Sequence, residues 1–345
     1  NTQSEMKFGI VGGGFGYDCH YKALLNIEGT EIIGITDSGS ENLISKLSNP
    51  NLYIKNFDDL LSLKPDIISI VTPPISHFNL ISKSLQKNIH VLCEKPFCSN
   101  SIDSFKSLSL AEKAKLGNCV NFQYRFEPGI QFLKSKLDYQ LIGKVNHIHF
   151  TWLTSGKANP ESPWTWRNDL NKGGGVINAF LVHCIDLIQW LLGSEISAIE
   201  NTKSKVIISN RKNNQSVKVA VTAEDLIEVD LEINKDITAY CKVSNCVEKS
   251  SGMRIIINGT NGKLIYEHKP PFRSADQSVV LKNSTTEKVL FNASNIIPPH
   301  ISDTRIYSLK ELYKLFIASI KDDNQTAYPN FKTGHNIQKI LDQLR

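Results

Sequence analysis

The sequence predicts an α/β domain with a parallel, doubly wound sheet, followed by an α+β domain with an open, mostly antiparallel sheet. Three observations lead to this prediction. Short apolar segments alternate with helical patterns in the first third of the chain, a glycine-rich turn follows the first segment, and later segments alternate apolar with polar residues. A chain of 345 residues has room for about two domains with cores of their own.

Five apolar segments in the first third predict buried parallel strands, because they are apolar on both faces. They are residues 7–11, 31–36, 66–72, 89–93 and 118–122. Helical patterns lie between them, after Gly16 and over residues 41–47, 77–85 and 102–116. In the last pattern, Ile102, Phe105 and Leu108 recur at helical spacing. This alternation is typical of a doubly wound sheet.

The pattern changes near residue 123, so we predict domains at residues 1–122 and 123–345. In the second part Ile148, Phe150 and Trp152 alternate with polar residues, which predicts strands with one covered face. Asn261-Gly262 is typical of a hairpin turn. We expect helices near residues 180, 309–320 and 337–344 to cover one face of this sheet. The other face suits a second subunit, so we expect a homodimer or homotetramer.

Composition and charge argue against several classes of protein. The net charge is +5, and the basic residues are scattered, so we expect no nucleic-acid partner. The longest stretch without Asp, Glu, Lys or Arg, residues 67–82, contains two prolines, so we expect no membrane span. No signal peptide is visible, and the seven Cys are dispersed, so we expect a cytoplasmic protein with free thiols. No cluster has metal-ligand spacing, so we predict no metal site.

A glycine-rich turn joins the first predicted strand to a helix. Such a turn lets backbone N–H groups approach a pyrophosphate at the positive end of the helix. The fingerprint is incomplete, because Tyr17 stands where the third glycine is expected. The predicted cofactor contacts in this turn are Gly12, Gly14, Phe15 and Gly16.

Asp37 ends the second predicted strand. A carboxylate at this point accepts hydrogen bonds from the adenosine ribose hydroxyls of a dinucleotide, although a strand-end turn residue is an alternative. The residues that follow, Ser38-Gly39-Ser40, offer no Arg or Lys to a 2′-phosphate. We therefore predict NAD as the cofactor in preference to NADP.

Further motifs follow the third and fourth strands, at the carboxyl edge where doubly wound sheets bind ligands. They are Thr72-Pro73-Pro74 with His77, and Glu94-Lys95-Pro96. With the glycine turn and later segments, they resemble the glucose–fructose oxidoreductase / inositol dehydrogenase / MocA (Gfo/Idh/MocA) family of sugar and cyclitol dehydrogenases. The later segments are Gln123-Tyr124-Arg125-Phe126, Trp166-Arg167 before three glycines, His183-x-x-Asp186, and Gly259-Thr260-x-Gly262. The resemblance covers almost the whole chain. It implies a Rossmann domain and a substrate-binding, oligomerisation domain.

The resemblance also implies roles for individual residues. Oxidation of an alcohol by NAD needs a base for the hydroxyl proton, and the family's motif places this chemistry at Lys95, with Glu94 orienting it or contacting the nicotinamide ribose. His183 is implied as a catalytic proton relay or substrate ligand. Asp186, on the same helix face, is implied as a substrate ligand.

Other residues are candidates for binding. We assign cofactor contacts to Thr72, Pro73, His77, Glu94, Lys95, Gln123 and Arg125. We assign substrate contacts to Tyr124, Arg167, Asn178 and Asp186. Arg167 suits a carboxylate or phosphate of the substrate, with a structural ion pair as the alternative.

The sequence departs from the family one helical turn before His183. Many members carry Asp or Asn there, whereas this chain has Ala179, and the nearest polar residue is Asn178. One interpretation is that Lys95 and His183 suffice, with Ala179 making room for a bulkier substrate. Alternatively, the protein binds the cofactor yet catalyses poorly.

These observations predict an NAD(P)-dependent oxidoreductase. It would interconvert a hydroxyl and a ketone on a small-molecule sugar, sugar derivative, nucleotide-linked sugar or cyclitol. Two alternatives stay open. One is an NAD-dependent glycosidase that oxidises the sugar transiently, and the other is a catalytically weak NAD-binding regulatory protein.

Overall fold

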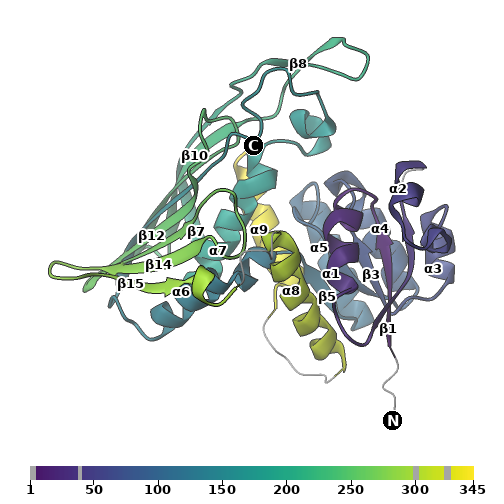
Figure 1. Ribbon diagram of the computed structural model, residues 1–345, viewed down its shortest axis with the longest axis horizontal. Helices are drawn as coiled ribbons and strands as arrows, with labels where there is room; N and C mark the ends of the chain where they lie inside the picture. Colours follow the sequence, from purple (N-terminus) through teal and green to yellow (C-terminus); the bar gives the residue numbers. More distant parts are fainter. Residues whose placement is uncertain (1–4, 38–40, 298–302, 322–327) are drawn as a thin grey trace. The chain divides into compact units, whose positions relative to one another are not determined.

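The computed structural model describes residues 5–37, 41–297, 303–321 and 328–345 (Figure 1). The chain forms two compact units. The first comprises Asn1–Gln123 and Arg305–Asp342, and the second comprises Tyr124–Thr304 and Gln343–Arg345. The residues Ser38-Gly39-Ser40, on which the preference for NAD over NADP was based, lie outside the described ranges.

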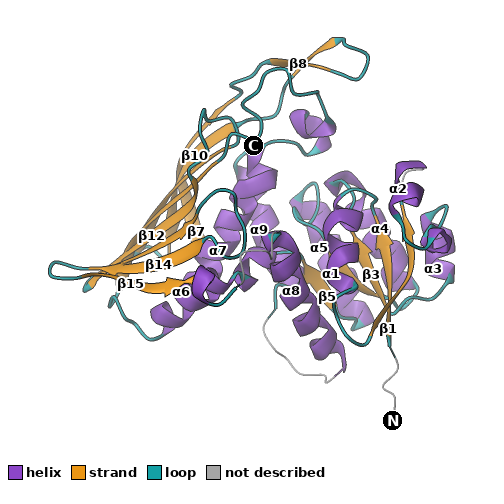
Figure 2. Cartoon of the chain, in the orientation of Figure 1, coloured by secondary structure: helices purple, strands orange, loops and turns teal. Residues whose placement is uncertain are grey.

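The first unit contains a five-stranded parallel sheet in the order β2-β1-β3-β4-β5 (Figure 2). Phe8 and Ile10 on β1 and Ile68 on β3 are fully buried, as expected for strands covered on both faces. The predicted α/β sheet is therefore confirmed. Its strands are β1 (Met6–Val11), β2 (Thr30–Thr36), β3 (Ile67–Ile70), β4 (His90–Cys93) and β5 (Asn118–Val120).

The helices of this unit connect the strands. A π-helical segment, Gly16–Tyr21, follows the glycine turn directly. The α-helices are α1 (Lys22–Leu24), α2 (Glu41–Lys46), α3 (Phe57–Ser62), α4 (His77–Gln86) and α5 (Ser101–Ala114), with short 3-10 segments at Pro50–Leu52 and Pro74–Ser76. The sequence patterns did not predict α3, whose first turn is capped by the side chain of Asn56.

The two C-terminal helices, α8 (Thr304–Lys321) and α9 (Phe331–Gln343), pack mainly within the first unit. The ring of Tyr313 on α8 lies 5.6 Å from that of Phe8. The ring of Phe331 on α9 lies 4.4 Å from that of Phe97. Our prediction that these helices cover the second sheet was wrong, and residues 123–345 do not form one packing unit. An apolar stripe shows that a helix is buried, but not against which sheet.

Helix α5 confirms the predicted helix, but the apolar residues that predicted it are not its most buried ones. Ile102 and Phe105 are 67% and 58% exposed, whereas Ser104 and Ser107 are fully buried. The hydroxyl of Ser104 lies 2.7 Å from Nδ1 of His335 on α9. The small side chain of Ser104 therefore contacts α9.

The second unit contains an eight-stranded sheet in the order β15-β14-β13-β12-β6-β11-β10-β7. Among the described strands of this sheet, only β6 and β11 pair in parallel, so the predicted open, mostly antiparallel sheet is confirmed. Its strands are β6 (Val145–Leu153), β7 (Ile196–Lys205), β10 (Leu226–Ile233), β11 (Ile237–Ser244), β12 (Gly252–Gly259), β13 (Gly262–His268), β14 (Gln277–Lys282) and β15 (Glu287–Asn292). A small sheet pairs β8 (Asn210–Lys212) with β9 (Lys218–Ala220).

Helices α6 (Pro128–Asp138) and α7 (Val182–Leu192) belong to the same unit. Ile148, Phe150 and Trp152 of β6 are buried, as their alternation predicted. A π-helical segment, Ile177–Leu181, runs directly into α7. The remaining short 3-10 segments are Gln123–Phe126, Trp166–Asn168, Leu170–Lys172 and Ala293–Asn295.

The segment Leu170–Leu192 reaches the length and mean hydropathy of a membrane span. The apolar window within it is 67% buried inside the protein, as in the core helix of a soluble domain. Among the described residues, no group of three or more His, Cys, Asp or Glu side chains is placed to hold a metal ion.

Candidate active site

The glycine turn after β1 brings its backbone against the ends of β2 and β3. Gly12 has a φ of 123°, and a Cβ there would lie 2.3 Å from the carbonyl oxygen of Val71. A Cβ at Gly13 would lie 2.6 Å from Oδ2 of Asp37. Only glycine fits these two positions. The structure therefore places the Asp37 carboxylate beside the turn, as the prediction requires.

The helical segment Gly16–Tyr21 begins directly at the glycine turn. The N–H groups of Tyr17 and Asp18 donate to the carbonyl of Gly14, at 3.1 Å and 3.0 Å. A Cβ at Gly14 would meet no atom within 4 Å, so this side of the turn is free for a ligand. Phe15, also predicted to contact the cofactor, packs edge-on against His20 with ring centroids 5.6 Å apart.

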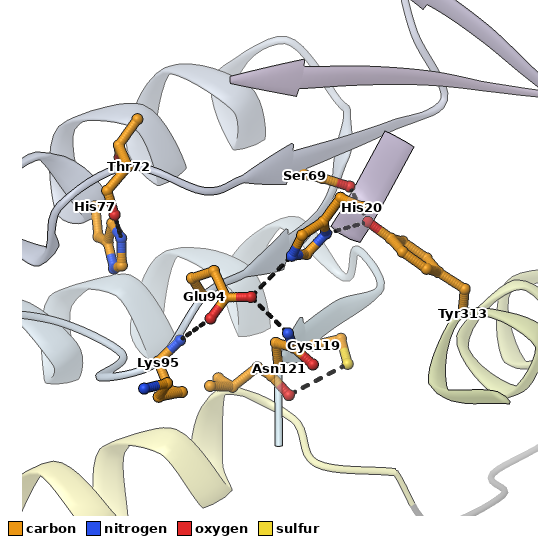
Figure 3. Close-up of polar contacts among 10 residues, drawn as sticks. His20, Ser69, Thr72, His77, Glu94, Lys95, Cys119, Asn121 and Tyr313 are labelled. Atoms are coloured by element: carbon orange, nitrogen blue, oxygen red, sulfur yellow. Dashed lines mark hydrogen bonds and ion pairs between the residues drawn. The ribbon is translucent and has the colours of Figure 1, made fainter. Parts of the chain in front are cut away.

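His77 lies against Thr72 in the segment that follows β3 (Figure 3), and it also contacts the loop that follows β4. Its Nε2 lies 2.8 Å from the carbonyl oxygen of Thr72, and its Nδ1 lies 3.1 Å from that of Phe97. The side chain is fully buried. Burial lowers the pKa of His77, whereas the backbone carbonyls raise it. Because both ring nitrogens face the protein's own backbone, the structure favours a structural role over the predicted cofactor contact.

Thr72 and Pro73 lie at the carboxyl end of β3, where the prediction placed them. The Thr72 hydroxyl lies 2.6 Å from that of Ser76, and Ser76 donates to the carbonyl of Pro73 at 2.9 Å. These bonds form a small turn that begins α4.

Glu94 follows β4 and is held from several sides (Figure 3). Its Oε1 accepts a hydrogen bond from Nδ2 of Asn121 and lies 2.8 Å from Nε2 of His20. Its Oε2 accepts from the backbone N–H of Lys95 at 3.2 Å. Burial raises the pKa of Glu94, but the hydrogen bonds from His20 and Asn121 and the nearby charge of Lys95 hold it below its usual value. The carboxylate is therefore ionised and oriented.

Lys95 is half-buried at the carboxyl end of the parallel sheet. Its peptide bond to Pro96 is cis. Asn121, which sequence reasoning missed, lies at the same edge, directly after β5. The rule that selected Thr72 and Glu94, a polar residue at the end of a parallel strand, also selects Asn121.

His183 lies on α7 of the second unit and is 2% exposed. The ring of Tyr124 packs edge-on against it, with centroids 4.7 Å apart. Trp152 packs edge-on against Tyr124 at 5.1 Å and against Phe180 at 4.8 Å. The structure thus brings together two predicted site residues, His183 and Tyr124, within a group of aromatic rings. Lys95 belongs to the other unit.

Asp186 and Arg125 form a buried ion pair, which differs from their predicted roles. Nε of Arg125 donates to Oδ2 of Asp186 at 2.8 Å, and Nη2 donates to Oδ1. Asp186 is 1% exposed and Arg125 is 8% exposed. Burial raises the pKa of Asp186, while the charge and hydrogen bonds of Arg125 lower it. The pairing favours a structural role over substrate binding by Asp186 and cofactor binding by Arg125.

Asn178 and Arg167 lie around the three glycines that precede α7. Nδ2 of Asn178 donates to the carbonyl of Gly173 at 2.9 Å. Arg167 is exposed, with its guanidinium 5.0 Å from the ring centroid of Trp166. Its carbonyl accepts from the N–H of Gly175 at 3.1 Å. The backbone of the Arg167 segment is therefore tied to the start of the helix that carries His183.

Two family models match this chain. An oxidoreductase family with an NAD-binding Rossmann fold matches residues 6–122, and the GFO/IDH/MocA C-terminal domain matches residues 130–265. The chain belongs to the GFO/IDH/MocA family. It is an NAD-binding oxidoreductase of that family, as the motifs predicted.

Known relatives of this family member extend over nearly its whole length. Glucose-6-phosphate 3-dehydrogenase of Bacillus subtilis is 25% identical over 98% of this chain and 95% of its own. Inositol 2-dehydrogenase of Rhizobium meliloti is 21% identical over 93% of this chain and 91% of its own. The solved structure of levoglucosan dehydrogenase with NADH and levoglucosan has a TM-score of 0.85 at 18% identity, covering 99% of this chain and 96% of the other.

The residues of the first unit fit an NAD molecule. Besides the open side of the glycine turn, two buried polar atoms at the carboxyl ends of strands have no hydrogen-bond partner among the described residues: Oγ1 of Thr36 and Oε1 of Gln123. Their side chains are 1% and 4% exposed. Buried polar atoms are seldom left without a partner, and a polar dinucleotide supplies donors and acceptors there.

Replacement of Asp37 by alanine is expected to weaken NADH binding about tenfold and to narrow the preference for NAD over NADP. The carboxylate accepts ribose hydroxyl bonds and repels a 2′-phosphate. Fluorescence titration with NADH and NADPH measures both effects. Asp66→Ala is the matched control. Asp66 also accepts a hydrogen bond, from the backbone N–H of Lys7, but it lies at the amino end of β3 and away from the glycine turn. An unchanged ratio of the two affinities in Asp37→Ala contradicts the assignment.

Proposed function

We propose that this chain catalyses reversible oxidation of a hydroxyl to a ketone on a sugar, sugar derivative, nucleotide-linked sugar or cyclitol. The observation that carries the proposal is the family membership, with relatives named as sugar and cyclitol dehydrogenases over more than nine-tenths of the chain. The placement of Lys95 beside an ionised, oriented Glu94 at the carboxyl edge of the sheet supports it.

In the proposed reaction Lys95 exchanges a proton with the substrate hydroxyl. When bound, NAD would supply the acceptor for the hydride that leaves the carbinol carbon. A lysine ammonium polarises the ketone oxygen in the reverse direction, and the neutral amine accepts the hydroxyl proton in the forward direction. His183, assigned as a proton relay or substrate ligand, is held by the ring of Tyr124. Glu94 fixes the backbone of Lys95.

NADH absorbance across a panel of substrates tests this proposal. The panel contains glucose, glucose 6-phosphate, levoglucosan, myo-inositol and a nucleotide-linked sugar. Net formation of NADH with one of them is the expected result. Release of an aglycone from glycosides without net NADH selects the glycosidase. Binding of NADH without turnover of any substrate selects the regulatory protein.

The surroundings of Arg167 support the proposal that the substrate carries an anionic group. Among the described residues, no carboxylate lies within ion-pair distance of its guanidinium. Burial lowers the pKa of Lys157, and the nearby charges of Arg211 and Arg167 lower it further. Nη1 and Nη2 of Arg211 donate to backbone carbonyls, including that of Ser162 at 3.3 Å. Lys157 and Arg167 thus form a local excess of positive charge, which suits a phosphate or carboxylate.

Arg167→Ala is expected to raise KM for a phosphorylated sugar about tenfold, since a charge-assisted hydrogen bond is lost. The KM for the unphosphorylated sugar should change less than twofold. Steady-state kinetics on glucose and glucose 6-phosphate measure both values. Arg254→Ala is the control, because Arg254 pairs with Glu267 on the second sheet. Equal changes for the two sugars contradict recognition of an anion by Arg167.

The open face of the second sheet supports the proposed homodimer or homotetramer. Cross-strand neighbours form a row along this face, from Tyr240 through His149 and Ile256 to Ile265 and Val280. All five are partly exposed. Apolar side chains in such a row favour contact with a second subunit. A strictly monomeric sedimentation profile contradicts this proposal.

We also propose a cytoplasmic location. All seven cysteines are free thiols and six of them are buried, which supports a reducing compartment. Fractionation of cells that produce the protein tests the location.

A further inference from the structure

A buried series of hydrogen bonds leads from α8 to the Glu94–Lys95 motif (Figure 3). The hydroxyl of Ser69 on β3 lies 2.6 Å from that of Tyr313 on α8. The Tyr313 hydroxyl lies 2.6 Å from Nδ1 of His20. Nε2 of His20 lies 2.8 Å from Oε1 of Glu94. Ser69, Tyr313 and His20 are fully buried, and Glu94 is 7% exposed.

The chemistry of the groups sets the direction of these bonds. An ionised carboxylate only accepts, so Nε2 of His20 donates to Glu94. In the tautomer that carries its proton on Nε2, Nδ1 accepts a hydrogen bond from the hydroxyl of Tyr313. The oxygen of Tyr313 in turn accepts from Ser69. Every polar atom in the series is satisfied when all bonds run toward Glu94.

The series determines which way the Glu94 carboxylate faces. His20 and Asn121 both hold Oε1. Oε2 is therefore kept toward the backbone N–H of Lys95, which donates to it. Loss of the bond from His20 leaves Oε1 held by Asn121 alone, so the carboxylate turns more easily away from that N–H.

We infer that His20 and Tyr313 are positioning residues for Lys95 and act through Glu94. Tyr313 holds His20 in the tautomer that donates from Nε2, and His20 holds the carboxylate that orients the Lys95 backbone. A helix close to the C-terminus thereby supports a catalytic loop in the N-terminal third of the chain. The effect on turnover rests on the proposed function, whereas the effect on the Lys95 backbone does not.

Two variants and their combination test the inference: Tyr313→Phe, His20→Asn and the double variant. Tyr328→Phe is the matched control. Tyr328 also belongs to the first unit and hydrogen-bonds Ser319 of α8. Within the part of the chain that the structure describes, it has no contact with His20 or Glu94. Amide hydrogen exchange over residues 93–97 reports the Lys95 N–H directly. Kinetic constants, NADH affinity and Tm are measured on the same proteins.

We expect exchange at Lys95 to be about tenfold faster in Tyr313→Phe and in His20→Asn, because the N–H loses its fixed acceptor. We expect kcat to fall about tenfold while KM for the sugar changes less than twofold. The double variant should be no worse than His20→Asn alone, since one series is interrupted twice. Tyr328→Phe should match the wild type in all of these measurements.

Unchanged exchange at Lys95 overturns the inference. A uniform rise in amide exchange across the first unit also overturns it, because such a rise indicates only general destabilisation. An additive loss of kcat in the double variant overturns it as well. An unaltered kcat with faster exchange also overturns it, because orientation of Lys95 would then not matter to the reaction. Failure of the wild type to oxidise any sugar on the panel counts against the proposed function. The exchange measurement still tests whether His20 and Tyr313 position the backbone of Lys95.

Discussion

Replacing Lys95 with alanine is expected to lower kcat by about 10²–10⁴-fold while changing the affinity for NADH far less. Without the amine, no group at this position exchanges the proton of the substrate hydroxyl. The glycine turn and Asp37 lie at other strand ends and remain intact in the variant. Steady-state kinetics and fluorescence titration with NADH measure the two quantities.

Further variants separate the roles of charge and proton transfer at this position. Lys95→Arg keeps the positive charge but does not give up a proton near neutral pH, so it should remain as inactive as Lys95→Ala. A small primary amine added to Lys95→Ala should restore part of the rate. The control is Lys83→Ala, because Lys83 pairs with Asp58 at the surface. Equal turnover of Lys95→Ala and the wild type removes Lys95 from the mechanism.

The largest expected effect on stability comes from Asp186→Ala, which should lower the free energy of unfolding by about 3–5 kcal/mol. This change leaves the guanidinium of Arg125 buried without its carboxylate. The double variant with Arg125→Met and Asp186→Leu should recover most of the loss, because no isolated charge then remains in the core. Urea unfolding followed by circular dichroism measures the change.

The control for this prediction is the exposed pair of Lys83 and Asp58. Asp58→Ala should change the free energy of unfolding by only about 0–1 kcal/mol, since water screens a surface pair. Sugar kinetics on Asp186→Ala decide between the two roles of Asp186. A large rise in KM with little loss of stability would restore the substrate-binding role predicted from the motif.

Local patterns in the sequence predicted most of the elements that position the site. The glycine turn, Asp37 and Glu94–Lys95 each follow an apolar segment that forms a parallel strand. Strands of one parallel sheet present their carboxyl ends at a common edge. Their placement at that edge therefore followed from the order of segments alone. The hairpin at Asn261-Gly262 was equally local.

The sequence was less informative about the partners of individual side chains. Motif position suggested ligand contacts for His77, Arg125 and Asp186, but each is engaged by the protein itself. A motif shows that a residue type matters at a position. It does not distinguish a ligand contact from a bond that holds the site in shape, because both require the same donors and acceptors.

The sequence by itself determined the two kinds of sheet, the glycine turn and the candidate catalytic Lys95, because each depends on residues close together in the chain. Only the tertiary structure decided that α8 joins the first unit and that Tyr313 meets His20. It likewise decided that Arg125 pairs with Asp186. These contacts join residues far apart in sequence, and an apolar or polar pattern does not specify which distant surface will meet it.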